Sequence, residues 1–195
     1  CKDINPLLHV FGIDAHVSPN AQLEGNFLQR EETAFSLRLV EVASLSFKKN
    51  TWCNTHLELS ANRSKDGQDI SAVVQLTSQE QQWDTFGTTK DLAVALVWKD
   101  DQIYFSSNIG PSESPKQLSI RGTALLLDST IEIALIPTQV VCADNQWQVH
   151  PTNRIILSKS RIEFQDFIFY KGQQHISLGG ALSSTPTEVL HLTIQ

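Results

Sequence analysis

Apolar and polar residues alternate along most of this 195-residue chain, and this alternation constrains the fold more than any other feature. Successive side chains of a strand point to opposite sides of a sheet, so a period of two produces a strand with one apolar face. The apolar positions of the clearest segments are Phe35, Leu37 and Leu39; Ile70, Ala72, Val74 and Leu76; Leu92, Val94, Leu96 and Trp98; Ile131, Ile133 and Leu135; and Leu190, Leu192 and Ile194. These segments predict an all-β fold whose sheet has one apolar face.

Turn-forming residues separate the alternating segments. Asp66-Gly67, Lys99-Asp100-Asp101 and Lys171-Gly172 each lie between two apolar segments, and these residue types favour tight turns. Each is therefore predicted to connect the strands of a hairpin. Glu41 is the single interruption within its own segment. After it, the apolar face is expected to resume at Ala43, Leu45 and Phe47.

Two stretches do not follow the alternation. Residues 77–90 are polar around Trp83 and Phe86, and a short helical turn and a long loop fit them equally well. Residues 106–117, which contain Pro, Gly and Ser, are the best internal break. We expect residues 1–195 to form a single β-rich segment that includes this break as a long connection.

Composition excludes several classes of protein. The formal net charge is -6 and the basic residues are scattered, so the chain lacks the basic surface that binds nucleic acid or anionic membranes. No apolar run is long enough for a membrane span, and no signal peptide pattern is present. Because the chain contains no Met, we expect it to be part of a longer protein.

The three cysteines, Cys1, Cys53 and Cys142, are widely separated and fit neither a dense disulfide framework nor the spacing of a metal site. The sequence is compatible with two alternatives: Cys53 and Cys142 form a disulfide, or both are inert thiols. Cys1 is either the lipid-bearing first residue of a mature lipoprotein or simply the end of an excised segment.

The sequence contains no constellation that would support catalysis or bind a cofactor. It has no nucleophile elbow, phosphate-binding glycine loop or HExxH motif. The carboxylate pairs Glu31-Glu32, Asp100-Asp101 and Glu163 with Asp166 are interpreted as solvated faces and turns rather than as an acid and base. The dispersed histidines, none at a metal-binding spacing, are His9, His16, His56, His150, His175 and His191. We therefore expect a protein that is not an enzyme and binds no metal or cofactor.

The C-terminal third has the bulkiest apolar positions. Its alternating residues predict a hairpin with one strongly apolar face, and from periodicity alone a closed sandwich core and a lipid-facing groove are both compatible with it. The residues expected to line such a groove are Ile131, Ile133, Leu135, Ile162, Phe164, Phe167, Phe169, Ile176 and Leu178.

The same region carries a succession of short motifs: a Trp-containing strand, an aromatic strand, a Gly-Gln turn, an Ile-Ser-Leu-x-Gly strand, and a polar-Pro turn before a Leu-rich strand. They are Trp147–Pro151, Ile155–Leu157, Ser160–Phe167, Gly172–Gly180 and Ser183–Pro186. This succession resembles a recurrent internal stretch of the TamB family, the AsmA/TamB-like translocation and assembly proteins, in Gram-negative bacteria of the Bacteroides type. Residues 11–15 and 19–27 are also similar to the family's link into a new set of strands.

The resemblance implies an elongated, partly open, twisted sheet of antiparallel or mixed strands, taco-like, with an apolar concave face. It implies a periplasmic segment of an inner-membrane-anchored protein that acts as a passive conduit for phospholipid transport between membranes, for outer-membrane protein assembly, or for both. The implied partners are phospholipid acyl chains or unfolded outer-membrane protein strands, together with an outer-membrane barrel that binds the parent protein elsewhere. Open sheet edges are also expected to permit an edge-strand dimer.

The alternative interpretation is a closed β-sandwich that binds a glycan or protein ligand at a cell surface, tethered through Cys1. Its candidate stacking platforms are Trp83, Trp98 and Trp147, because aromatic faces commonly bind sugars. An exposed Trp and a compact closed core would favour this alternative, whereas an uncovered apolar face would favour the conduit.

Overall fold

The computed structural model describes residues 3, 5–10, 12, 14–30, 32–65, 69–84, 87–110, 118–136, 139–142, 145–183 and 188–195. The chain divides into two compact units. Unit 1 comprises Cys1–Asp100 and Asn108–Pro111, and unit 2 comprises Asp101–Ser107 and Ser112–Gln195. Residues 111–117, within the expected internal break, lie outside the described residues.

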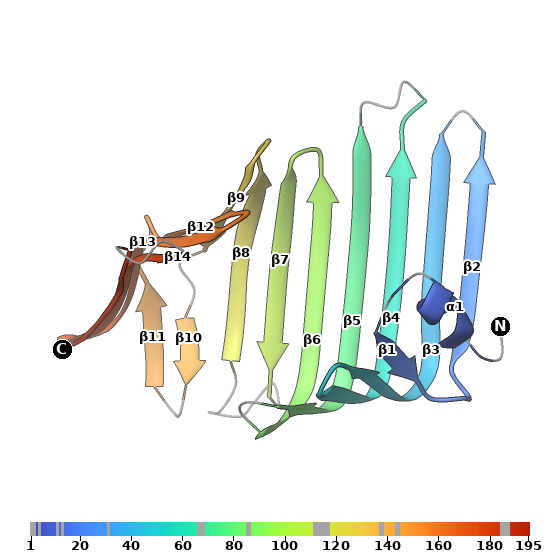
Figure 1. The fold of residues 1–195 in the computed structure, drawn as a ribbon, viewed down its shortest axis with the longest axis horizontal. Helices are drawn as coiled ribbons and strands as arrows, with labels where there is room; N and C mark the ends of the chain where they lie inside the picture. Colours follow the sequence, from blue (N-terminus) through green and yellow to red (C-terminus); the bar gives the residue numbers. More distant parts are fainter. Residues whose placement is uncertain are drawn as a thin grey trace. The chain divides into compact units, whose positions relative to one another are not determined.

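Unit 1 is an antiparallel sheet with one short helix (Figure 1). Its elements are α1 (Asn5–Val10), β1 (Ala15–Val17), β2 (Gln22–Gln29), β3 (Thr33–Phe47), β4 (Asn50–Arg63), β5 (Ile70–Trp83) and β6 (Gly87–Lys99). Strands β3, β4, β5 and β6 pair in sequence order, while β1 and β2 pair with different parts of β3. These long neighbouring hairpins follow directly from the alternating segments.

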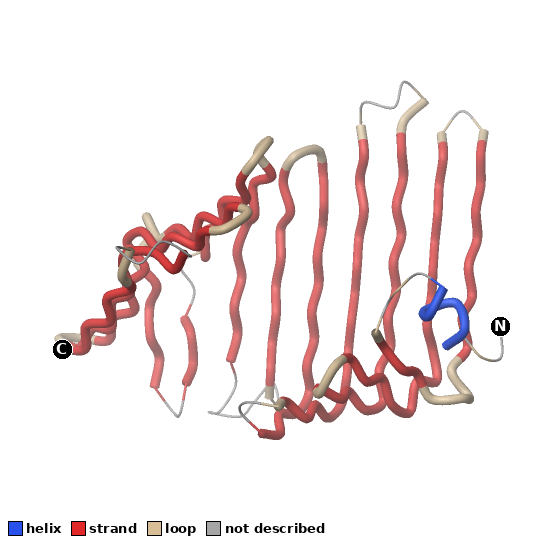
Figure 2. Tube along the Cα trace, in the orientation of Figure 1, coloured by secondary structure: helices blue, strands red, loops and turns tan. Residues whose placement is uncertain are grey.

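Unit 2 is also built almost wholly of antiparallel strands (Figure 2). They are β7 (Gln102–Ile109), which ends just beyond the unit, β8 (Leu118–Leu126), β9 (Thr130–Leu135), β10 (Gln139–Cys142), β11 (Asn145–Val149), β12 (Arg154–Ser158), β13 (Arg161–Lys171), β14 (Gln174–Ser183) and β15 (Leu190–Ile194). The pairing order is β8, β9, β12, β13, β14 and β15, and β11 joins β13 to β10.

The sheets are open. Strand β2 pairs only with β3, and β15 pairs only with β14, so among the described strands each has a free edge. The all-β fold with open antiparallel pairing is therefore confirmed, in preference to a closed β-sandwich. The hairpin at Lys171-Gly172 is also confirmed, and Gly172 adopts the positive φ of 58° that such a turn uses. Residues 66–68, the predicted turn between β4 and β5, lie outside the described residues, although these two strands pair as expected.

A row of irregular positions bends the strands of unit 1. Glu41, Asn54 and Asp91 have φ values of 57°, 49° and 52°, and the pairing of β3 with β4 shifts register between Leu39 and Val42. The extra residue moves Val42, which is 1% exposed, to the buried side. The expectation that Ala43 continues the apolar face beyond Glu41 is therefore wrong, because a bulge changes the alternation; Ala43 is exposed.

Residues 77–83 and 87–90 are strand rather than the loop or helical turn considered above, and residues 85–86 lie outside the described residues. They form the end of β5 and the start of β6. Gln81 is fully buried there. Its side-chain amide is satisfied, because the NH₂ group donates to the Ser78 carbonyl at 2.7 Å and the oxygen accepts from the Thr89 hydroxyl at 2.9 Å. Trp83 donates to the same hydroxyl and contacts Trp52 edge-on. A polar strand is stable here because its buried groups are hydrogen-bonded.

The side chain of Asn153 extends the sheet of unit 2, because it forms the two hydrogen bonds to Leu135 that the backbone of a paired strand would form. Its side-chain amide donates to the Leu135 carbonyl and its side-chain oxygen accepts from the Leu135 N–H, both at 2.8 Å, and the residue is 1% exposed. The same amide also donates to the His150 carbonyl. This one side chain therefore satisfies the backbone at the end of β9.

Asn153→Ala is expected to lower the free energy of unfolding by about 2 kcal/mol, because the partly buried backbone groups of Leu135 lose their partner. Urea denaturation would measure the loss. The neighbouring Thr152→Ala, at an exposed position, provides the control and should cost less than about 1 kcal/mol. Equal losses in the two variants would contradict the role assigned to Asn153.

Candidate functional site

Strand pairing brings the nine predicted groove residues to one face of unit 2. Ile131 and Ile162 both pair with Leu157, whereas Ile133 and Phe164 both pair with Ile155. Directly paired residues share a face of a sheet, so β9, β12 and β13 present these side chains on the same side. The remaining pairs on this face are Phe167 with Leu178, Phe169 with Ile176, and Leu135 with Gly122.

A bulge in β13 keeps its aromatic residues together. Phe164 and Phe167 are three residues apart and would point to opposite faces of a regular strand. The register shifts between them, and Asp166 has a φ of 48°, so both side chains lie on the same face. Their rings contact edge-on at 5.7 Å, and Phe167 contacts Phe169 at 5.2 Å. The result is a continuous aromatic row.

This apolar face has no covering layer among the described residues. None of the nine residues is buried: Ile131 and Ile162 are 38% and 37% exposed, and the others are half-buried. On the outermost strand β15, Leu192 and Ile194 are still more exposed and pair with Leu178 and Ile176. An apolar surface of this extent is a feature of binding sites rather than of ordinary protein surface.

Sequence reasoning missed several members of the face. Ile155 and Leu157 lie between two strands of predicted residues, and Leu192 and Ile194 extend the face at its edge. Their alternation was visible, but assigning them to this face requires the strand order. Gly122 also belongs to it: the Phe105 ring occupies the space where a Gly122 side chain would lie.

Unit 1 has an apolar face of its own, which the predicted site did not include. Three rows of paired residues cross β2 to β6. They are Leu23, Leu39, Leu57, Leu76 and Val94; Gly25, Leu37, Leu59, Val74 and Leu96; and Phe27, Phe35, Ala61, Ala72 and Trp98. Every member is apolar or glycine, so the face resembles that of unit 2.

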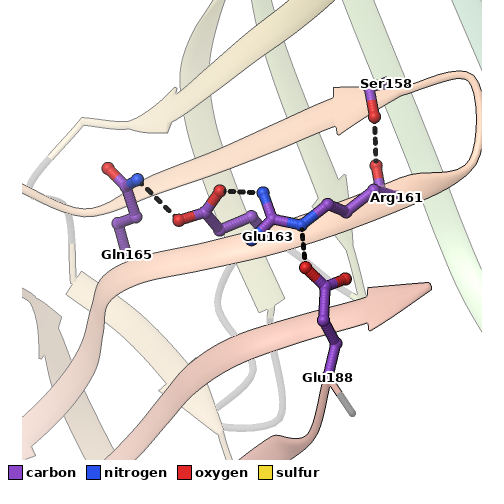
Figure 3. A network of polar contacts seen from close by, with 5 residues as sticks. All are labelled: Ser158, Arg161, Glu163, Gln165 and Glu188. Carbon is purple, nitrogen blue, oxygen red and sulfur yellow. Dashed lines mark hydrogen bonds and ion pairs between the residues drawn. The ribbon is translucent and has the colours of Figure 1, made fainter. Parts of the chain in front are cut away.

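One charged network lies on the opposite face of unit 2 (Figure 3). Arg161 on β13 pairs with Glu163 and donates from Nε to the Glu188 carboxylate at 2.8 Å. Gln165 donates to the other Glu163 oxygen at 2.9 Å. Hydrogen bonds from Gln165 and Arg161 hold the pKa of Glu163 below its ordinary value, and those from Ser183 and Arg161 do the same for Glu188. The network ties the segment before β15 to β13.

Acidification is expected to weaken this network. A carboxylate whose pKa is lower in the folded state stabilises the fold fully above its ordinary pKa of 4.5, and this contribution is lost as the pH falls further. Urea midpoints measured between neutral pH and pH values below 4.5 should therefore fall more steeply for the wild type than for Arg161→Gln. Parallel pH profiles would contradict the prediction.

The described residues contain no other arrangement that suggests chemistry. They include no cluster of His, Cys, Asp and Glu able to hold a metal ion. Cys53 is a free thiol, and the Cys142 side chain and Cys1 lie outside the described residues. A shallow hollow of about 430 Å³ in unit 1 is lined mainly by polar groups around the Arg38–Glu58 ion pair. No described helix is sufficiently long and apolar to cross a membrane.

Two of the candidate sugar platforms, Trp83 and Trp98, lie at opposite ends of the paired strands β5 and β6, and Trp147 belongs to unit 2. Trp83 is half-buried against Trp52 and Trp147 is half-buried, whereas Trp98 is 36% exposed. Trp98 belongs to the apolar face of unit 1 through its pairing with Ala72, and its indole N–H donates to the Asp100 carbonyl. It therefore contributes to an apolar surface rather than standing alone on a polar one.

Comparisons with protein-family models, with curated proteins and with solved structures find no match for this chain.

Proposed function

We propose that this chain is a periplasmic segment of a TamB-like protein and a passive hydrophobic conduit for phospholipid. The observation that carries the proposal is the half-exposed apolar face of unit 2, in which β9, β12, β13 and β14 all contribute bulky side chains. An acyl chain exposed to water costs about 0.8 kcal/mol per CH₂, and contact with such a face removes much of that cost. A conduit of this kind needs no catalytic residue.

Phospholipid is favoured over unfolded outer-membrane protein strands because the exposed apolar area lies mainly on the faces of the sheets. A strand would bind an edge through backbone hydrogen bonds, whereas an acyl chain has no hydrogen-bonding groups and requires apolar side chains. The free edges of β2 and β15 would still permit pairing with a second copy. The glycan-binding alternative has less support, because the sheets are open and the candidate Trp residues are dispersed.

A vesicle transfer assay tests the proposal. Donor vesicles carry a fluorescent phospholipid with a quencher, and its appearance in acceptor vesicles is followed with and without the protein. The protein is expected to accelerate transfer in proportion to its concentration. No acceleration, from protein shown by circular dichroism to be folded, would overturn phospholipid transport by this chain.

A further inference from the structure

The apolar face of unit 1 is closed at one end. Beside the strand bend, Leu39 and Val42 are buried together with Val17 and Ala21, and Leu8 of α1 packs against this cluster. Figure 1 shows α1 near the bent ends of the strands. The next row across the sheet is buried on all four strands. It consists of Val42, Thr55, Ser78 and Leu92.

The face becomes more exposed toward its other end. Along β3, exposure rises from 6% at Leu39 to 39% at Phe35, and Phe27 beside it is 65% exposed. The far part of the face is therefore the less covered part along β3 and its neighbour β2. A ligand can enter from that end, and its apolar part would end at the bend.

One charged residue, Arg63, lies on the apolar face at its open end. Arg63 pairs with Thr33 and Ile70, which places it on the apolar face one row beyond Phe35 and Ala61. Among the strand residues paired on this face between the bend and the open end, Arg63 is the one charged residue. Asp100 follows β6 at the same end, where its N–H donates to the Ile70 carbonyl at 3.2 Å. Arg63 is exposed, and within the described part of the chain it forms no ion pair. An arginine in this position suits an anionic group attached to an apolar body.

The length of the face fits an acyl chain. From Leu57 to Arg63, β4 advances about 20 Å at the usual rise of a strand. One leaflet of the bilayer hydrocarbon core is about 15 Å thick, which is the depth that acyl chains fill. The distance from the closed end of the face to Arg63 is therefore long enough for the acyl chains of a phospholipid whose headgroup lies at Arg63.

We propose that the apolar face of unit 1 binds one phospholipid molecule in a fixed direction, with its phosphate at Arg63 and its acyl chains toward Leu39 and Leu57. The inference rests on the proposed function and adds to it a binding site, a ligand orientation and a residue for the phosphate. A fixed direction would make this part of the conduit select amphiphiles with an anionic headgroup.

Photocrosslinking with two phospholipid probes tests the direction. One probe carries a diazirine at the acyl terminus and the other carries it on the headgroup; each is supplied in phosphatidylglycerol vesicles, and crosslinked peptides are identified by mass spectrometry. The acyl probe is expected to crosslink to peptides near Leu23, Leu39 and Leu57. The headgroup probe is expected to crosslink near Arg63 and Ile70. The reverse pattern, or crosslinks confined to unit 2, would overturn this inference while leaving phospholipid binding intact. No crosslinking anywhere would overturn both.

A matched pair of charge reversals tests the role of Arg63. Lys99 lies at the same end of the strands but pairs with Ser71, on the opposite face. Arg63→Glu is expected to reduce headgroup crosslinking in unit 1 about tenfold, whereas Lys99→Glu should leave it within about twofold. Equal losses would show a general effect of net charge and overturn the assignment of Arg63. Because both residues are exposed, neither variant is expected to impair folding.

Discussion

Phe167→Asp is expected to reduce phospholipid binding by unit 2 more than about a hundredfold, because a carboxylate would have to lose its hydration beside hydrocarbon. Phe167 lies at the centre of the aromatic row and contacts both Phe164 and Phe169. It is half-buried rather than buried, so the free energy of unfolding should change much less than lipid binding does. Titration with a fluorescent phospholipid and urea denaturation would measure the two effects separately.

Two control variants make this result specific. Phe167→Leu keeps the face apolar and should bind phospholipid nearly as well as the wild type. Ser177→Asp introduces the same charge on the opposite face, where Ser177 pairs with Ile168, and should also retain binding. If Phe167→Asp unfolds the protein, the position is core and the face is not a ligand surface. If it binds phospholipid normally, the face of unit 2 is not the site.

Gly180→Ala is expected to lower the free energy of unfolding by about 3 kcal/mol or more. Gly180 has a φ of 94°, which a residue with a side chain rarely adopts, and a Cβ there would lie 2.2 Å from the Val189 carbonyl oxygen. That carbonyl belongs to the backbone leading into β15, so it cannot move without disturbing the pairing of β14 with β15. Loss of this pairing would also remove Leu192 and Ile194 from the apolar face.

The adjacent Gly179 provides the control. A Cβ at Gly179 meets no atom within 4 Å and its φ is not positive, so Gly179→Ala should be close to neutral. Urea denaturation would give the stability difference, and hydrogen exchange of the β15 amides would show whether that strand detaches first. Similar stability of the two variants, with β15 still protected, would contradict the constraint at Gly180.

The regular part of the fold could be predicted from the sequence because its alternation is unbroken. Val74 and Leu76 share a face with Leu96 and Val94, as a period of two requires. The bend could not be predicted, because Glu41 adopts a left-handed conformation without being glycine, and such positions carry no strong sequence signal. Helix α1 was also missed, since six residues are too few to show a helical period.

The candidate site was predictable in part. The sequence indicated bulky residues such as Phe164 and Phe167, but their unequal spacing contradicted a regular strand, and only the bulge explains how both share one face. The apolar face of unit 1 depends on the register of five strands, which a single sequence does not provide. Arg63 is an example, because it can be assigned to the apolar face only when its pairing with Thr33 and Ile70 is known.

The uncovered apolar faces of the two units are proposed to hold phospholipid. The most direct measurement is native mass spectrometry of the protein purified without detergent from Gram-negative cells, combined with analysis of the lipid extracted from it and with an unrelated β-sandwich protein as control. Stoichiometric phospholipid is expected on this chain and none on the control. A folded, lipid-free protein from the same membranes would contradict this expectation.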